Sequence, residues 1–201
     1  MPDIKAHVID DDDDARDSLA FLLSTADIEV ETYPSAPDFL KVAKEAQGVV
    51  VTDVRMPEMD GLALVRHLNE LGVGMPVVVM TGHADVPLAV EAMKAGVIDF
   101  IEKPYDDATM LGAVRAALER GRESQARGNE RAEFLRRMES LSPRERQVME
   151  GLVAGKPNKV IAFDLDISQR TVEIYRAHVM TKTQAKSLSE LVRMAMVAGL
   201  A

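Results

Sequence analysis

A run of five aspartates, Asp10 to Asp14, follows a short apolar stretch with the composition of a buried strand. Another aspartate, Asp53, directly follows the apolar run 49–52. Ligands of open parallel sheets bind at the carboxyl ends of the strands, so Asp10, Asp11 and Asp53 are expected to meet at one edge of a sheet. Three carboxylates repel one another there unless a cation lies between them, and hard oxygen ligands suit Mg²⁺. The pattern therefore predicts a magnesium site.

Two more polar side chains follow apolar runs of the same kind: Thr81 after residues 77–80, and Lys103 after residues 97–101. A carboxylate can act as a nucleophile toward a phosphoryl group, while a divalent ion and a lysine offset the charge on its oxygens. The chemistry predicted for this set is phosphoryl transfer to Asp53. The expected metal ligands are Asp10, Asp11, Asp53 and the backbone carbonyl of Arg55.

These side chains need a sheet whose strands all end at one edge, and the first half of the chain has that pattern. Short β-branched runs alternate with amphipathic stretches, and the runs are apolar on both faces. This favours a parallel sheet covered by helices, a doubly wound α/β domain with five βα units. The expected strands are residues 6–9, 29–33, 49–52, 77–80 and 97–101; the expected helices lie near residues 13–26, 36–46, 60–71, 85–95 and 107–121.

Residues 3–121 resemble the receiver domain of two-component response regulators. The motifs that carry the resemblance are Ile9-Asp10-Asp11, Asp53-Val54-Arg55-Met56-Pro57 with Asp60-Gly61, Thr81-Gly82 and Lys103-Pro104. The resemblance implies a flavodoxin-like (βα)5 fold and phosphorylation of Asp53 by a phosphohistidine on a sensor histidine kinase. It also implies that Thr81 and Phe100 form the switch that responds to the phosphoryl group, and that the Lys103–Pro104 peptide bond is cis.

Two enzymatic alternatives are disfavoured by single residues. Phosphatases with an aspartyl nucleophile need a second acid two residues downstream, where this chain has Arg55. The segment 151–156 has too few residues between its glycines for a phosphate-binding loop of a nucleotide kinase, and Pro157 follows it. We therefore expect no dedicated enzyme, but a magnesium-dependent phosphoacceptor that catalyses only its own phosphorylation and dephosphorylation.

The net charge of −9 divides unevenly along the chain. Residues 1–122 hold 23 acidic and 11 basic side chains, a net charge of −12, whereas residues 123–201 hold 10 and 13, a net charge of +3. Between the halves, residues 122–138 are mostly charged or small and offer little to bury. They are predicted to form a linker, either disordered or a solvated helix, and their Glu, Arg and Ala content without proline favours the helix.

Residues 139–201 show helical patterns only. Ser142-Pro143-Arg144-Glu145 has the form of a capping box, Asn158 and Ser168 can cap two further helices, and a fourth helix is expected over about 187–198. Two short helices joined at Asp166-Ile167-Ser168 form a helix-turn-helix candidate. The segment resembles the all-α, four-helix DNA-binding domain of LuxR-type regulators.

The third helix of this segment has two distinct faces. Val172, Tyr175, Val179 and Thr183 share the face expected to pack on the core. The other face can enter a major groove, where glutamate accepts from cytosine and isoleucine touches a thymine methyl group. The predicted DNA-binding residues are Lys159, Arg170, Thr171, Glu173, Ile174, Arg176 and Ala177, with Arg176 open between a phosphate contact and an internal ion pair.

Three side chains around this helix carry separate expectations. Thr183 stands where the family usually has Leu or Met, so its buried hydroxyl is expected to weaken packing near the fourth helix. Lys182 is left open between an ordinary solvated lysine and a DNA contact. His178 is expected at the surface.

The order of receiver, linker and LuxR-type domain resembles the NarL/FixJ family of transcriptional regulators across nearly the whole chain, and most of all its FixJ-type nitrogen-fixation branch. This implies a FixL-like sensor histidine kinase, a homodimer on phosphorylation, double-stranded promoter DNA of the fix genes, activation of those genes, and RNA polymerase as a further partner. The absence of cysteine excludes disulfides and thiol catalysis. No signal or membrane segment is evident, so a cytoplasmic protein is expected. For residues 139–201, the main alternative to DNA binding is a helical domain that binds RNA or docks another protein.

Overall fold

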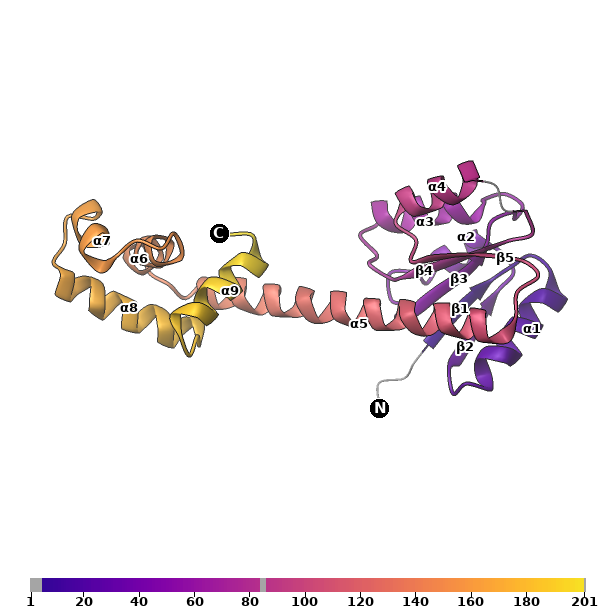
Figure 1. The fold of residues 1–201 in the computed structure, drawn as a ribbon, viewed down its shortest axis with the longest axis horizontal. Coiled ribbons are helices and arrows are strands. Elements are labelled where there is room, and N and C mark those ends of the chain that lie inside the picture. Colours follow the sequence, from indigo (N-terminus) through magenta and orange to yellow (C-terminus); the bar gives the residue numbers. More distant parts are fainter. Residues whose placement is uncertain (1–4, 84–85, 201) are drawn as a thin grey trace. The chain divides into compact units, whose positions relative to one another are not determined.

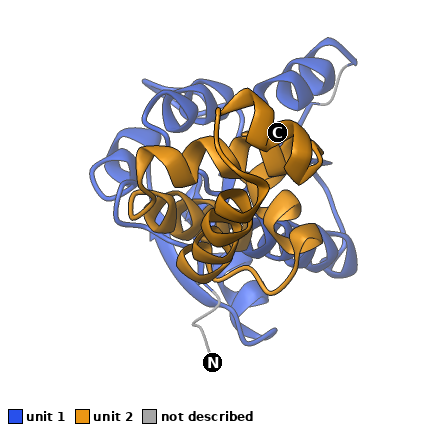
Figure 2. Cartoon of the chain, turned by 90° about the vertical axis from the view of Figure 1, so that its left-hand side faces the viewer, with its two compact units in different colours: residues 1–124 blue, residues 125–201 orange. Residues whose placement is uncertain are grey.

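The computed structural model describes residues 5–83 and 86–200. The chain forms two compact units, Met1–Ser124 and Gln125–Ala201 (Figure 2). We call them unit 1 and unit 2 and treat each by itself. None of the described helices combines the length and the apolar character that a membrane span requires.

Unit 1 contains a five-stranded parallel sheet with strand order β2-β1-β3-β4-β5 (Figure 1). This order is that of the flavodoxin-like doubly wound fold, in which the strand order reverses beside β1. The strands are β1 (Lys5–Ile9), β2 (Glu29–Tyr33), β3 (Val49–Asp53), β4 (Val77–Thr81) and β5 (Asp99–Glu102). The helices are α1 (Asp13–Ser24), α2 (Ala36–Leu40), α3 (Gly61–Glu70), α4 (Val86–Ala95) and α5 (Asp107–Met138), the last of which continues into unit 2.

The central strands explain why this sheet is covered on both faces. Every residue of β3 and β4 is buried, and their valine side chains point alternately into two separate apolar cores. Val50 and Val79 belong to the core that includes Phe39 and Leu64, whereas Val51 and Val78 belong to the other. The predicted α/β sheet is therefore confirmed.

Two predicted elements of unit 1 differ from the structure. The helix expected near residues 36–46 is only α2, Ala36–Leu40, and residues 41–45 form turns instead. In these turns the Val42 and Glu45 amides donate to carbonyls three residues earlier, at 3.0 Å each, as in tight turns. The last strand begins at Asp99 rather than at Val97. The predicted helix 85–95 is seen from Val86, while Asp85 lies outside the described residues.

Unit 2 is built from the end of α5 and four further helices: α6 (Pro143–Val153), α7 (Asn158–Asp164), α8 (Gln169–Thr183) and α9 (Leu188–Ala198). Ser142, Ser168 and Ser187 cap α6, α8 and α9, since each side chain accepts from a backbone amide three residues later. The helix favoured for residues 122–138 is part of α5. The expectation that these residues bury little is wrong, because Phe134 and Met138 are only 1% and 4% exposed within the core of unit 2.

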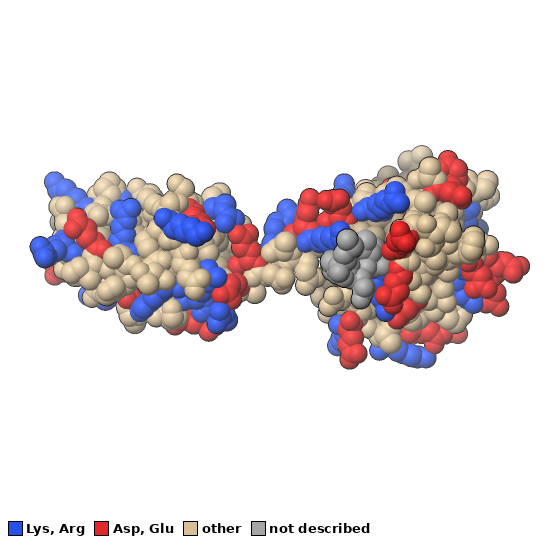
Figure 3. Space-filling view, turned by 90° about the horizontal axis from the view of Figure 1, so that it is seen from below, with Lys and Arg blue, Asp and Glu red and all other residues tan. Residues whose placement is uncertain are grey.

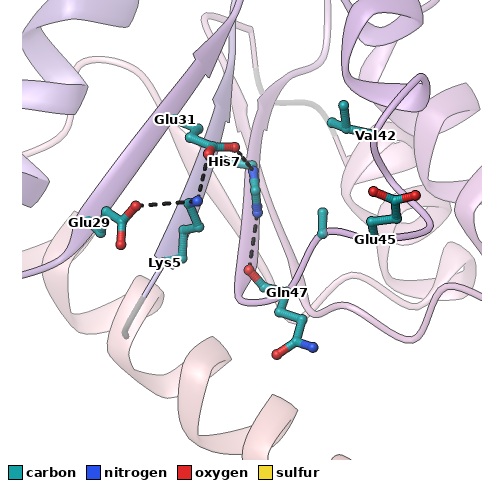
Figure 4. A pocket seen from close by; sticks show the side chains of 8 residues that line it. Lys5, His7, Glu29, Glu31, Val42, Glu45 and Gln47 are labelled. Atoms are coloured by element: carbon teal, nitrogen blue, oxygen red, sulfur yellow. Dashed lines mark hydrogen bonds and ion pairs between the residues drawn. The ribbon is translucent and has the colours of Figure 1, made fainter. Parts of the chain in front are cut away.

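A pocket of about 620 Å³ opens near the amino ends of β1 and β2, beside the turns that follow α2 (Figure 4). His7 lies buried behind it, with its Nε2 3.1 Å from the carbonyl oxygen of Gln47 and its Nδ1 3.3 Å from the hydroxyl of Tyr33. A carbonyl can only accept, so Nε2 carries the proton of the neutral ring. Burial lowers the pKa of His7, although the Gln47 carbonyl partly opposes this shift.

We expect His7 to make the stability of unit 1 pH-dependent. Because its pKa is lowered on folding, its contribution is complete above about pH 6.5 and is lost as the pH falls toward the lowered value, with a slope of at most about 1.4 kcal/mol per pH unit. Urea unfolding of His7→Phe from pH 7.5 to 5 should lose this slope. His67→Gln, at an exposed position of α3, should keep it. An unchanged slope in His7→Phe would show that another group is responsible.

Candidate functional site

The carboxyl ends of β1 and β3 bring Asp10 and Asp53 together. Both side chains are buried, with residue exposures of 2% and 8%. The ammonium group of Lys103, which follows β5, donates to both: its Nζ is 2.8 Å from Asp10 Oδ2 and 2.6 Å from Asp53 Oδ1. Three of the predicted site residues thus form one contact, which we call the Asp10–Lys103–Asp53 triad.

The triad places a cation where two carboxylates would otherwise repel each other. Burial disfavours the charged form of Lys103, but the hydrogen bonds to Asp10 and Asp53 outweigh it and raise its pKa. Lys103 is therefore charged at neutral pH. Two buried aspartate side chains share this one cation, and their carboxyl oxygens are the donor type that a divalent cation such as Mg²⁺ prefers.

Short backbone contacts fix the loops that carry these side chains. The Asp12 amide donates to Asp10 Oδ1 at 3.0 Å, and the Arg55 amide donates to Asp53 Oδ2 at 2.6 Å. At the start of α3, a Cβ on Gly61 would lie 2.2 Å from the Asp53 carbonyl oxygen, so only glycine fits there. The Lys103–Pro104 peptide bond is cis, as the resemblance implied. Asp53 Oδ2 and Asp10 Oδ1 thus have one backbone donor each.

The two remaining predicted metal ligands are not members of the triad. Asp11 and Arg55 are exposed residues of the two loops. Among residues 5–83 and 86–200, no three carboxylate or histidine side chains are gathered as a metal-binding group. The donor chemistry nevertheless fits Mg²⁺, since the predicted set consists only of carboxylate and carbonyl oxygens. Two of the predicted ligands, Asp10 and Asp53, are thus already brought together in the triad.

Neither predicted switch residue has a hydrogen bond to Asp53 among the described residues. Thr81 is fully buried at the end of β4, and its hydroxyl lies 3.1 Å from the His83 carbonyl oxygen, to which it donates. Its oxygen also accepts from the His83 amide at 3.2 Å. Phe100 is half-buried against the core that contains Phe39. Thr81 is therefore held by its own turn in this structure.

In unit 2, α7 and α8 form the predicted helix-turn-helix. The turn between them contains Asp166 in the left-handed region at φ 53°, and Ser168 caps α8. The predicted DNA-binding residues lie on the outer surface of these helices. Lys159, Arg170, Glu173, Ile174 and Ala177 are exposed, and Thr171 and Arg176 are half-exposed.

Charge on this unit is mixed rather than uniformly basic. In the face shown in Figure 3, Lys and Arg side chains on unit 2 are interspersed with a few acidic groups, whereas unit 1 shows larger groups of Asp and Glu. Arg176 has no ion pair among the described residues, which removes the internal-pair alternative. Lys159 and Arg170 are likewise without an ion pair within the described parts of the chain. Of these three cations, Lys159 and Arg170 are exposed and Arg176 is half-exposed, and none of them is ion-paired among the described residues.

The buried face of α8 is as predicted, with one correction. Val172, Val179 and Thr183 are fully buried, and Tyr175 packs partly against the same core. The Thr183 hydroxyl does not lack a partner, because it donates to the Val179 carbonyl oxygen at 2.7 Å. The main physical reason for expecting weakened packing there is therefore absent.

The sequence did not single out the ionic contact that holds α8. Glu145 on α6 is 4% exposed, and its Oε2 accepts from Lys182 Nζ at 2.6 Å and from the Ser142 amide at 2.7 Å. His178, more than half exposed as expected, lies with Nδ1 3.1 Å from Glu145 Oε1. Lys182, which also donates to the Ser140 carbonyl, is therefore ion-paired within unit 2 and is not an ordinary solvated lysine. Lys182 and the Ser142 amide lower the pKa of Glu145 to about 2.

Comparison with known proteins accounts for both units. Residues 6–115 match the family model of the response regulator receiver domain, and residues 139–195 match that of bacterial regulatory proteins of the luxR family. The transcriptional regulatory protein FixJ of Azorhizobium caulinodans is 56% identical over 203 residues, which cover 100% of this chain and 96% of that protein.

Two solved structures resemble most of the chain. Full-length FixJ from B. japonicum has a TM-score of 0.61 at 48% identity, and the alignment covers 100% of both chains. The response regulator StyR has a TM-score of 0.80 at 36% identity, with 96% of this chain and 98% of that chain covered.

Proposed function

Since the chain belongs to the two-component response regulators, with a receiver domain, a LuxR-type DNA-binding domain and a close similarity to FixJ, we propose that phosphorylation of Asp53 controls its binding to promoter DNA. The observation that supports the proposal is the Asp10–Lys103–Asp53 triad at the carboxyl edge of the sheet. The phosphoryl donor is a phosphohistidine on a sensor histidine kinase.

In the proposed reaction, a carboxylate oxygen of Asp53 attacks the phosphorus atom of the phosphohistidine. The new O–P bond forms as the P–N bond breaks, and the imidazole nitrogen leaves with the electron pair and takes up a proton. The Lys103 ammonium already donates a hydrogen bond to Asp53 Oδ1, so it is placed to stabilise the negative charge on the phosphoryl oxygens. Asp10, Asp11, Asp53 and the Arg55 carbonyl would hold Mg²⁺, which would neutralise charge on those oxygens.

The phosphoryl group then supplies new acceptors beside Thr81. We propose that the Thr81 hydroxyl leaves the His83 carbonyl for the phosphoryl group, and that Phe100 turns inward beside it. The surface around residues 86–103 would rearrange and favour a dimer of receivers. We propose that the protein catalyses only the formation and hydrolysis of the acyl phosphate on Asp53 and acts on no separate substrate.

A receiver dimer would carry two helix-turn-helix units into one complex, which raises their effective concentration at paired half-sites. Glu173, Ile174 and Ala177 would face base edges in the major groove, while Lys159, Arg170, Thr171 and Arg176 would contact phosphates. The similarity to FixJ leads us to propose fix-type promoters as targets, activation through RNA polymerase, a FixL-like kinase and a cytoplasmic location.

The substitution Asp53→Asn tests the proposed acceptor. It removes the nucleophile but keeps the shape of the side chain, so labelling by acetyl phosphate with Mg²⁺ and the dimerisation that follows should both be lost. Asp60→Asn, at the exposed cap of α3, is a matched control and should be labelled like the native chain. Undiminished labelling and dimerisation of Asp53→Asn would contradict the proposal.

A further inference from the structure

Arg16 stands out on α1 because its side chain is only 13% exposed among the aspartates that open this helix. Its Nη1 donates to the Asp10 main-chain carbonyl at 2.7 Å, and its Nη2 forms an ion pair with the exposed Asp13. Asp10 lies beyond the end of β1, so its carbonyl is outside the strand ladder. Among the described residues, Arg16 is the one donor to this buried carbonyl.

Asp10 is bound both at its side chain and at its main-chain carbonyl. Lys103 and the Asp12 amide bind the Asp10 carboxylate, while Arg16 binds its carbonyl. The planar guanidinium joins this carbonyl to Asp13, in the first turn of α1, with two separate donors. The loop that carries Asp10 and Asp11 is thereby tied to the start of the helix.

We infer that Arg16 is a positioning residue for cation binding: through the Asp10 carbonyl it sets the orientation in which Asp10 and Asp11 meet a divalent ion. The inference rests on the proposed function, because it assigns Arg16 to the magnesium site proposed there. Without this bond the β1–α1 loop can rotate about Asp10, and the carboxylates then need to be ordered by the ion itself.

The direction in which Mg²⁺ affinity changes when Arg16 is removed distinguishes a positioning role from a purely electrostatic one. Arg16 is a cation near a site for another cation, so its removal should strengthen Mg²⁺ binding if only charge matters. A positioning role predicts the opposite. A purely structural role predicts a lower melting temperature without any change in the Mg²⁺ concentration that gives half of the stabilisation.

The experiment is thermal unfolding of the full chain over a range of MgCl₂ concentrations, because a bound ion stabilises the folded state by mass action. Arg16→Met should raise the half-saturating Mg²⁺ concentration at least fivefold. Arg66→Met, which removes a cation paired with Glu91 elsewhere on unit 1, should stay within twofold of the native chain. Labelling by acetyl phosphate should show the same rise in the Mg²⁺ requirement, with little change at saturating Mg²⁺.

Each outcome decides between the explanations. A half-saturating concentration in Arg16→Met that is unchanged or lower than in the native chain overturns the inference. If Arg16→Met does not fold, Arg16→Lys takes its place, since the single ammonium nitrogen of lysine cannot occupy the positions of both Nη1 and Nη2. A Mg²⁺ requirement unchanged from the native chain again overturns the inference. If the native chain itself gains no stability from Mg²⁺, the proposed magnesium site fails, and the role of Arg16 fails with it.

Discussion

Replacing Lys103 with methionine is expected to slow phosphorylation of Asp53 by about 10²-fold, the usual cost of losing one fixed electrostatic group at a reacting centre. Lys103 is the cation that binds both Asp10 and Asp53, at 2.8 and 2.6 Å. Methionine fills the same space but leaves the two buried carboxylates facing each other. The attacking carboxylate then lacks a partner for the charge that moves onto the phosphoryl oxygens.

The measurement is the initial rate of labelling by acetyl phosphate at saturating Mg²⁺. Lys94→Met is the matched control, because Lys94 is an exposed lysine of α4 and its loss changes the net charge equally. The control should be labelled at the native rate. If Lys103→Met is labelled as fast as the control, the triad serves only to stabilise unit 1.

The second large effect is expected at Glu145, in unit 2. Glu145→Gln keeps the size of the side chain but removes the charge that binds Lys182 and the Ser142 amide. Hydrogen bonds to buried charged groups contribute about 1.5–3 kcal/mol each, and breaking a buried ion pair costs more than an exposed one. We expect unit 2 to lose about 2–4 kcal/mol of stability at pH 7, and DNA affinity to fall because α8 is no longer held against α6.

The dependence on pH identifies the cause. The pKa of Glu145 is about 2 in the folded chain, against an ordinary value of 4.5, so its stabilising effect is complete above about pH 4.5 and is lost as the pH falls toward 2. Thermal unfolding from pH 7 to 3 should show this loss in the native chain and not in Glu145→Gln. Glu150→Gln, an exposed position on the same helix, should behave like the native chain. If Glu145→Gln loses as much stability between pH 7 and 3 as Glu150→Gln does, Glu145 is not the group responsible.

The elements that could be predicted are those in which the local pattern and the tertiary environment agree. The runs around Val50 and Val78 are continuous and apolar because they are buried on both faces, so their strands and their parallel pairing follow from the sequence. Since the carboxyl ends of parallel strands meet at one edge, the proximity of Asp10, Asp53 and Lys103 follows as well. This part of the prediction requires no knowledge of individual side-chain contacts.

The features that were missed depend on partners distant in the sequence. Phe134 and Met138 lie four residues apart in a strongly charged stretch, and only the presence of unit 2 makes that short apolar stripe a core element. Glu145 looked like an ordinary capping residue, because its contact with Lys182 joins positions 37 residues apart. The same limit applies to α2, where a helical pattern continues to residue 46 but the chain turns at Lys41.

The Arg16 contact shows a different kind of limit. A basic residue after five aspartates is the ordinary pattern of a solvated helix with i,i+3 pairing, and its pair with Asp13 fits that reading. The second donor, to the Asp10 carbonyl, is what distinguishes it, and no spacing rule predicts a bond to a main-chain oxygen at a strand end. The burial of the side chain would have been the signal.

We propose that a phosphoryl group on Asp53 controls DNA binding by unit 2. The most direct test is the dissociation constant of the full chain for duplexes selected by the phosphorylated protein from a random-sequence pool. The constant is measured with and without acetyl phosphate and Mg²⁺, and for Asp53→Asn. We predict that phosphorylation strengthens binding of the native chain at least tenfold and leaves Asp53→Asn unchanged. Equal affinities before and after phosphorylation, or the same gain in Asp53→Asn, would contradict the claim.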